Sequence, residues 1–401
     1  MVLLALLLAI AMLLALIVLG ILQPGSGPPW HSAVWAGDRP VAAEPGAPTR
    51  DIVLTADSYG GTVTVFDAVT RQRLRQIDVV PDGREPHGIA RTLLYPMLHR
   101  IQGSNFAQDL SVSPDGTTIF VARGYLGDVA AFDLASGSLL WRTPVSGLRA
   151  DHTAVTLDGR RLFVAATTAN KVEAFDTISG EKIGEFATGE WAHGMELSRD
   201  GSKVYNGSIG NLLLPDSRKG ERNITVADTS SLRVEKTIPV AAGLRPFVVS
   251  DDGSTAYAQL SYFHGLVKID LASGRETARL DLPVPSEVAA IDPHEYTNEA
   301  AHHGLAISGN GRTLCAAATV SDYVAIVDAS TMQMTAQVPV GDEPGWAATS
   351  PDGRSCYVTE RGPDSVAVID YASGTLIDHV AVGDHPQAIK TARVAAGLLS
   401  N

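Results

Sequence analysis

Residues 340–383, VGDEPGWAATSPDGRSCYVTERGPDSVAVIDYASGTLIDHVAVG, decide the fold because their pattern recurs along the chain. The segment contains a turn of the SPDG type, short runs in which apolar and polar residues alternate, and a strand that ends in aspartate. Alternation with a period of two predicts half-buried β-strands rather than helices. We therefore take this segment as one repeat unit of an all-β domain.

Two markers count the repeats. Turns of this type end at six glycines, which are Gly116, Gly159, Gly201, Gly253, Gly311 and Gly353. Strands that end in aspartate occur seven times, at Asp67, Asp133, Asp176, Asp228, Asp270, Asp328 and Asp370. Successive glycines are 43, 42, 52, 58 and 42 residues apart. Units of about 40–45 residues with four short strands are typical of propeller blades. The predicted fold is therefore all-β, a seven-bladed β-propeller.

The quoted unit resembles the YVTN-type β-propeller repeat, and the resemblance covers roughly residues 51–395. It implies a seven-bladed, extracytoplasmic propeller of the kind found in surface-layer, YncE-like and amine-dehydrogenase heavy-chain-like proteins. Because this repeat occurs in proteins of many functions, the resemblance specifies the fold far better than the chemistry.

The two ends of the repeat region complement each other. Residues 52–79 supply three strands without a preceding inner strand, and residues 384–396 resemble an inner strand on its own. Pairing the last segment with the first would close the ring and remove an exposed sheet edge. The predicted propeller spans residues 51–396 and is followed by a tail at 397–401.

The N-terminal residues are of a different kind. Residues 2–22 are uninterrupted apolar residues, long enough to cross a bilayer as a helix. No Lys or Arg precedes them, and the nearest cleavage-like sequence, Val41-Ala42-Ala43, lies far beyond their end. We favour an uncleaved anchor at residues 1–22; a signal peptide, or a start site assigned too late, is the alternative. Residues 23–50 are rich in Pro and Gly and predict a linker.

Composition excludes several classes of protein. The 401 residues carry a formal charge of −13, and 45% of them are hydrophobic. The acidic balance argues against nucleic-acid binding, which needs a basic surface. Two cysteines cannot build a disulfide framework or a Cys-rich zinc module. We expect a monomeric propeller in the cell envelope, either anchored by its N-terminus or secreted.

Loop lengths distinguish the two faces of the predicted propeller. The DG turns and the later SG turns are short and lie on one face. The long insertions, residues 91–105, 209–221 and 283–301, all fall on the opposite face. Long loops on a rigid scaffold usually carry function, so this loop-rich face is the predicted binding face.

The same face should hold a ring of polar residues around the channel. Counting eight residues back from each repeat glycine gives equivalent positions at the starts of the inner strands, which are Gln108, Asp151, His193, Arg245, His303 and Gly345. The segment at His87 resembles those at His193 and His303. His152, His302 and His385 are immediate neighbours of ring positions.

One hypothesis for this ring is a metal site. His87, His193 and His303 come from alternate blades, and three imidazoles suit one Cu, Zn or Fe ion with an open position. His302, His294 and Glu295 are additional candidate ligands. Two other interpretations remain open: the His-Gly pairs are local turns, or the histidines form a metal-free polar or acid/base site.

Further candidates belong to a ligand-binding rim. It comprises His87, Asp151, His152, His193, Glu196, Arg245 and His303. Arg245 could hold a carboxylate or phosphate, although ion pairing across the channel is the favoured interpretation. Glu196 or Glu295 would be the base of a metal enzyme.

Two residue classes are predicted to be structural. The seven strand-end aspartates lie on the short-turn face, where an aspartate usually accepts backbone N–H groups in a turn. Cys315 lies four residues after its repeat glycine, Gly311, and Cys356 lies three residues after Gly353. We predict from this offset that they point to opposite faces of neighbouring blades and remain buried free thiols.

The leading functional hypothesis is a non-catalytic, membrane-tethered binding propeller that presents its loop-rich face to a protein or small-molecule ligand. The alternative is a histidine–metal oxidoreductase or hydrolase with its site at the channel mouth. A third hypothesis, an electron-transfer subunit resembling amine-dehydrogenase heavy chains, needs a partner chain that carries the cofactor.

Overall fold

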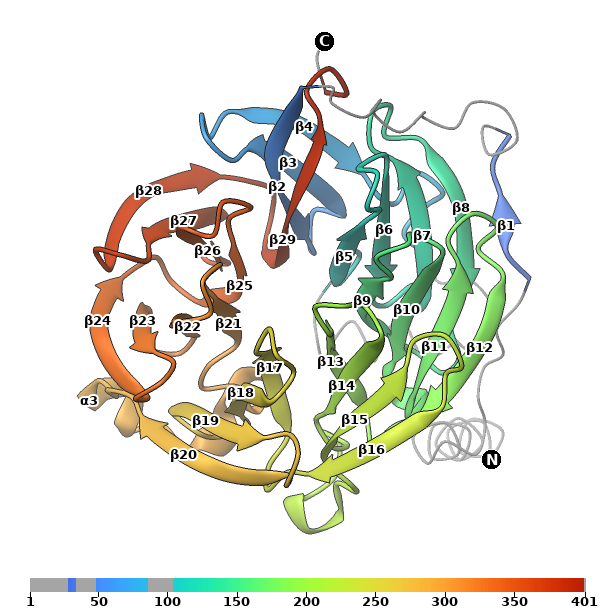
Figure 1. Ribbon diagram of the computed structural model, residues 1–401. Coiled ribbons are helices and arrows are strands. Elements are labelled where there is room, and N and C mark those ends of the chain that lie inside the picture. Colours follow the sequence, from blue (N-terminus) through green and yellow to red (C-terminus); the bar gives the residue numbers. More distant parts are fainter. Residues whose placement is uncertain (1–27, 34–47, 86–103, 400–401) are drawn as a thin grey trace, which may run out of the picture.

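Seven antiparallel sheets surround a central axis in the computed structural model of the chain (Figure 1). The structure describes residues 28–33, 48–85 and 104–399. It confirms the predicted all-β, seven-bladed propeller. The predicted helix at residues 1–22 lies outside the described residues. Among the residues that are described, no helix is long and apolar enough to cross a membrane.

Each blade runs from an inner strand at the axis to an outer strand at the rim. The first blade contains β29 (Pro386–Ala395), β2 (Thr49–Asp57), β3 (Thr62–Asp67) and β4 (Arg73–Asp78), and the second β5 (Asp109–Val112), β6 (Thr118–Arg123), β7 (Asp128–Asp133) and β8 (Leu139–Pro144). The third contains β9 (Ala150–Val155), β10 (Arg161–Ala166), β11 (Lys171–Asp176) and β12 (Lys182–Ala187), and the fourth β13 (Ala192–Leu197), β14 (Lys203–Ser208), β15 (Asn223–Asp228) and β16 (Val234–Pro239). The fifth contains β17 (Leu244–Val249), β18 (Thr255–Leu260), β19 (Gly265–Asp270) and β20 (Arg275–Asp281), and the sixth β21 (Gly304–Ile307), β22 (Thr313–Ala318), β23 (Tyr323–Asp328) and β24 (Gln333–Pro339). The seventh contains β25 (Pro344–Thr349), β26 (Ser355–Glu360), β27 (Ser365–Asp370) and β28 (Thr375–Ala381).

The connections contain short helices. They are α3 (Ser286–Ala289) and the single 3₁₀ turns η1 (Thr167–Ala169), η2 (Asp216–Arg218), η3 (Pro293–Glu295) and η4 (Thr297–Glu299). Three of them, α3, η3 and η4, lie between β20 and β21, in the predicted 283–301 insertion. The insertions therefore have local structure of their own.

The turns form as the repeat markers predict. All six repeat glycines have positive φ, between 67° and 76°, a region that side chains with a Cβ adopt at a cost. Each strand-end aspartate accepts the N–H group of the residue three positions after it, as in Thr70 N to Asp67 Oδ1 at 2.7 Å. The prediction that these aspartates are turn acceptors is confirmed.

Strand β29 pairs with β2 over the whole of β2, from Thr49 opposite Ala395 to Asp57 opposite Pro386. The end of the chain thus supplies the inner strand of the first blade (Figure 1). This pairing leaves no open edge where the ring begins, which is how a propeller avoids edge-to-edge association.

The blades adhere through apolar faces and a few buried hydrogen bonds. Between the third and fourth blades, for example, Phe163 and Val172 pack in one buried cluster with Val204. Tyrosines on second strands also reach the next blade: Tyr257 donates to Ala329 O at 2.9 Å, and Tyr357 to Ala68 O at 3.0 Å. Both acceptors directly follow a strand-end aspartate, so the turn that ends one strand also anchors the neighbouring blade.

Part of the predicted linker packs against the propeller. Strand β1 (Trp30–His31) adds a fifth strand to the second blade by pairing with β8. His31 Nε2 lies 2.7 Å from Ser179 O, and the Arg142 guanidinium lies over the Trp30 ring at 5.6 Å. The linker is therefore in contact with the rim of the propeller before the chain reaches the first blade.

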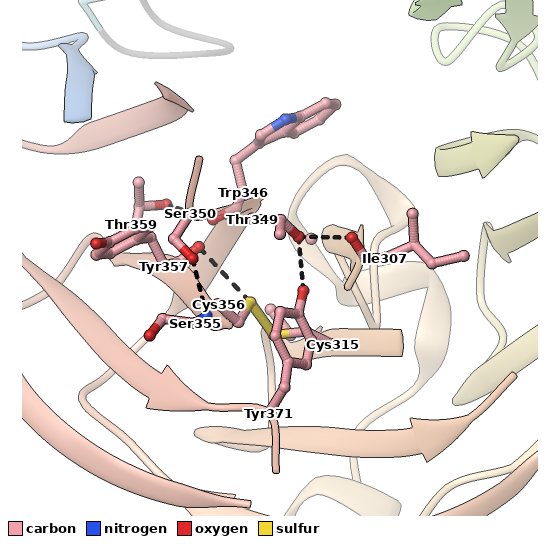
Figure 2. Close-up of a disulfide and its surroundings, with 12 residues drawn as sticks. Ile307, Cys315, Trp346, Thr349, Ser350, Ser355, Cys356, Tyr357, Thr359 and Tyr371 are labelled. Carbon is pink, nitrogen blue, oxygen red and sulfur yellow. Dashed lines mark hydrogen bonds between the residues drawn. A yellow bond between two sulfur atoms is a disulfide. The ribbon is translucent and has the colours of Figure 1, made fainter. Parts of the chain in front are cut away.

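The prediction of two free thiols is wrong. Cys315 on β22 and Cys356 on β26 form a disulfide across the interface of the sixth and seventh blades, with their Cα atoms 6.5 Å apart (Figure 2). Both cysteines are fully buried in one apolar cluster with Val324 and Val358. Next to the bridge, Thr349 Oγ1 donates to Ile307 O at 2.7 Å and so adds a second link between these blades.

The geometry of stacked sheets explains the error. Adjacent blades pack face to face, so the lower face of one blade meets the upper face of the next. Two residues that point to opposite faces of their own sheets are therefore the ones that can meet between blades. The one-residue offset between Cys315 and Cys356 therefore favours a disulfide between the blades rather than two free thiols.

We predict that replacing both cysteines by alanine lowers the free energy of unfolding by roughly 2–4 kcal/mol, because the unfolded chain loses a crosslink that spans 41 residues. Urea unfolding of the oxidised protein and of the Cys315→Ala/Cys356→Ala variant measures the difference. Peptide mapping without reductant provides the control. Two titratable thiols per chain in the unreduced, unfolded protein would contradict the pairing.

Candidate functional site

The loop-rich face carries two described insertions that are joined to each other. Residues 209–221 connect β14 to β15, and residues 283–301 connect β20 to β21. Lys219 from the first contacts Glu299 from the second, and its Nζ also lies 2.7 Å from Tyr262 OH. The predicted insertion at 91–105 lies outside the described residues, except for its last two.

An unusual backbone positions Glu299. Asn298 and Glu299 both have positive φ, 53° and 60°, although neither is glycine. Such a conformation costs roughly 1–2 kcal/mol per residue, and surrounding contacts must compensate for it. Those contacts are Lys219 on one side and Arg245 on the other, whose Nη2 lies 3.6 Å from Glu299 Oε2. Glu299 thus connects the insertions to the channel.

The channel ring forms at a β-bulge that four blades repeat. At the starts of β9, β13, β17 and β25, two residues of the inner strand face one residue of the second strand. The doubled pairs are Asp151-His152, His193-Gly194, Arg245-Pro246 and Gly345-Trp346. A bulge interrupts the alternation of a strand. Consecutive residues such as Asp151 and His152 can therefore both face the channel.

Asp151 is the centre of the ring. Its carboxylate accepts from Gln108 Nε2 at 2.7 Å and from Thr167 Oγ1 at 3.1 Å, and it lies 2.9 Å from His193 Nδ1. Burial opposes ionisation of Asp151, but nearby Arg149, His193 and His152 hold its pKa well below the usual value. The carboxylate is therefore an anion fixed in place.

His152 lies between two buried carboxylates. Its Nδ1 is 3.3 Å from Asp109 Oδ2, and its Nε2 is 3.5 Å from Asp151 Oδ1. The Trp346 indole stacks on its ring at 4.3 Å, with 22° between the planes. The imidazole is thus held in orientation by an aromatic face and by charges at both nitrogens.

His303 lies at the outer side of the same ring. Its ring centroid is 5.7 Å from that of His193 and 5.5 Å from Trp346. Arg361 Nη2 is 3.4 Å from His303 Nδ1, and the guanidinium also pairs with Glu343 at 3.2 Å. Burial lowers the pKa of His193 to about 4 and that of His303 well below its usual value, so both imidazoles are neutral at neutral pH.

Arg245 is buried and is only partly paired. Its Nε donates to Ser261 Oγ at 3.1 Å, and burial lowers its pKa to about 10. Its ion-pair contact is with Glu299 of the insertion, so the predicted pairing of Arg245 with Asp151 or Glu196 across the channel stays a prediction.

The structure separates the remaining candidates from this ring. His302 is buried beside the rings of His264 and Tyr323, at 5.8 and 6.4 Å, and neither of its nitrogens has a hydrogen-bond partner. His294 and Glu295 are exposed on η3, and the His294 ring lies 4.6 Å from that of Tyr262. His87 lies outside the described residues, so the three-histidine site remains untested.

Glu196 lies further along β13, towards the short-turn face. It lines a cleft of about 540 Å³ with Lys390 and Arg393 at that end of the channel. Burial raises its pKa to about 7. A second cleft on this face, of about 650 Å³, lies between the second and third blades and is lined by Asp115, Asp158 and Arg160. Next to His303 the described cavity is about 80 Å³.

Two residues of the ring, Asp109 and Trp346, were not predicted from the sequence, and His152 was predicted only as a rim residue beside a ring position. Each of the three follows a counted position by one residue. For His152 and Trp346 the structural reason is the bulge at the starts of β9 and β25, which a repeat alignment does not reveal. Arg361 comes from the end of β26, outside the inner strands altogether.

Comparison with known proteins identifies the family. Residues 59–377 match the family model of the outer membrane protein assembly factor BamB. The chain belongs to this BamB family. The YVTN-type label is not confirmed, and a PQQ-like propeller repeat fits instead. The apolar alternation and glycine turns of this chain indicate a propeller of four-stranded blades and leave its family undecided.

Solved structures agree with this BamB-family fold. Hydrazine synthase of Kuenenia stuttgartiensis is similar with a TM-score of 0.57 and 20% identity, over 71% of this chain and 88% of that one. The dihydro-heme d1 dehydrogenase NirN has a TM-score of 0.56 and 15% identity, over 89% of this chain and 68% of that one. No curated protein matches the sequence. At these identities the likeness concerns the fold alone.

The buried His302 predicts a loss of stability in acid. Burial lowers the pKa of His302 to about 3, whereas a histidine in the unfolded chain has a pKa of about 6.5. Between these values the unfolded chain binds a proton that the folded protein does not, so stability falls as the pH falls through this window. His302→Met should remove about 1.4 kcal/mol per pH unit of this dependence. Urea unfolding between pH 7.5 and 4.5 tests this, and parallel curves for variant and wild type would contradict it.

Proposed function

We propose that this BamB-family propeller is an extracytoplasmic, membrane-tethered binding protein whose loop-rich face takes a protein partner. The observation that carries the proposal is the contact between the two described insertions. Lys219 contacts Glu299 across them, which gives one continuous loop surface above the channel. A rigid scaffold that collects its long loops on one face is the usual arrangement of a binding surface.

The chemistry of this surface suits a protein. Leu213, Val284 and Ile291 are exposed on the insertions, with 46%, 36% and 42% of their surfaces accessible. Acidic residues surround them, among them Asp216, Glu287 and Asp292. Apolar contacts within a polar rim are typical of protein interfaces. The description of the matched family as an assembly factor supports the same class of partner.

Two features support the location. A disulfide such as Cys315–Cys356 forms and persists in an oxidising compartment, for example the periplasm or the cell exterior. The apolar run at residues 2–22 has the length of a membrane anchor. Packing of β1 on the second blade would keep such an anchor near the rim of the propeller.

The alternative function, a metal-dependent enzyme at the channel mouth, would need room for a substrate as well as for an ion. The space beside His303 is about 80 Å³, the volume of two or three water molecules at about 30 Å³ each. Substrate pockets are usually about 300–1,000 Å³. The cavity beside His303 could therefore hold water or an ion, but it is smaller than a usual substrate pocket.

Site-directed photocrosslinking tests the proposal. In cells that make the full-length chain, a photoreactive residue at Leu213 or Ile291 should give one discrete covalent adduct with an envelope protein. Leu157 and Ile178, which are 58% and 57% exposed on the short-turn face, provide matched controls and should give little or none. Lys219→Ala should weaken the adduct because it separates the two insertions. Equal labelling from both faces, or adducts from the control positions alone, would refute the proposal.

A further inference from the structure

We propose that Asp151, His152 and His193 bind one divalent transition-metal ion inside the channel. Each of the three offers one donor atom, these atoms lie within 4.8 Å of one another, and all three residues are buried. This set differs from the alternate-blade histidines that the sequence suggests. It is also independent of the partner-binding proposal, because it uses none of the exposed loops.

The spacing of the donors suits a small ion. In tetrahedral zinc sites, bonds of about 2.0–2.1 Å place neighbouring ligand atoms about 3.3 Å apart. His193 Nδ1 lies 2.9 Å from Asp151 Oδ2, and His152 Nε2 lies 3.5 Å from Asp151 Oδ1. The two imidazoles therefore flank the carboxylate at separations close to those of a coordination shell.

His152 gives an independent reason for a cation. A neutral imidazole has one N–H and one lone pair, yet both nitrogens of His152 face carboxylate oxygens, Nδ1 at 3.3 Å and Nε2 at 3.5 Å. In either tautomer, a nitrogen lone pair opposes a carboxylate oxygen. A metal ion between His152 Nε2 and Asp151 removes this repulsion. A second proton on His152 is the competing explanation, and the experiment below separates the two.

The surroundings of the three residues resemble a ligand-supporting shell. Asp109 faces His152 Nδ1, and its carboxylate is held by the backbone N–H of Thr153 at 2.8 Å. A carboxylate behind a metal-binding imidazole fixes the tautomer and the ring orientation. Trp346 stacks on the same ring, and Gln108 and Thr167 hold Asp151. The donors thus need little reorganisation to bind an ion.

Charge and donor type narrow the choice of metal. Two imidazoles and a carboxylate suit Zn²⁺ or Cu²⁺ rather than Mg²⁺ or Ca²⁺, which prefer oxygen ligands. Two side-chain cations compete with the ion for the carboxylates. Arg149 Nε lies 3.5 Å from Asp151 Oδ2, and Lys390 Nζ lies 3.8 Å from Asp109 Oδ1. Removal of Arg149 should therefore strengthen metal binding.

The experiment uses the full-length protein, purified, treated with a chelator and dialysed. Zn²⁺, Cu²⁺ and Co²⁺ are titrated separately, with stoichiometry from elemental analysis, affinity from calorimetry and the Co²⁺ absorption spectrum as a report of nitrogen ligation. We expect one equivalent of Zn²⁺ or Cu²⁺ per chain. His193→Ala and His152→Ala should weaken binding at least about tenfold, as expected for loss of an essential site residue. Arg149→Gln should tighten it.

His379→Ala is the matched control. His379 Nδ1 lies 2.8 Å from Glu360 Oε2, so it forms the same histidine–carboxylate pair, but outside the channel on β28. Its replacement should leave the stoichiometry and affinity unchanged. If His193→Ala fails to fold, the proposal is still tested by the Co²⁺ spectrum of the wild type and by the metal affinity of the Arg149→Gln variant. Absence of stoichiometric binding to the wild type would refute the site in favour of a protonated His152. Equal loss of binding in His379→Ala would refute its location.

Discussion

The pairing of β29 with β2 is the contact on which the rest of the molecule depends. It joins the last strand of the chain to the first blade over nine positions, so a linear array of blades becomes a closed ring. Closure fixes the distance of every inner strand from the axis. Equivalent positions of the successive repeats therefore all lie around the central channel. The polar ring is a consequence of this arrangement, because each inner strand presents its first residues to the same axis.

The centre of the ring is costly to build with charged residues. Asp109, Asp151, Arg245 and Arg361 are buried, and a buried charge loses hydration that only good partners can replace. The pairings are long in several cases, such as Lys390 to Asp109 at 3.8 Å and Arg245 to Glu299 at 3.6 Å. Alanine or valine, which fill the interfaces between blades, would fill the channel at lower cost. Of these buried charges, the carboxylates of Asp109 and Asp151 are the ones that the proposed ion would compensate.

Local features were predictable from the sequence, and features that depend on two blades were not. The glycine turns and the strand-end aspartates are decided within a few residues, so their pattern indicates their structure directly. Asp151, His193 and His303 were placed in the ring because repeat arithmetic transfers one position to the next. His152 and Trp346 face the same channel through a bulge, which no count of residues shows. The cysteine pair was mispredicted for a related reason. The face of its own sheet to which each cysteine points decides the pairing only when the facing blade is also considered.

Glu299 connects the two parts of the molecule to which we assign function. It contacts Lys219 of one insertion and Arg245 of the channel ring, and its left-handed backbone is maintained by these partners. A protein that docks on the insertions and draws Lys219 away would leave Glu299 with Arg245 alone. The field of Arg245 acts on His193, whose protonation it opposes. Such a contact on the loop surface would change the electrostatics of the channel through one carboxylate, without requiring any movement of the blades.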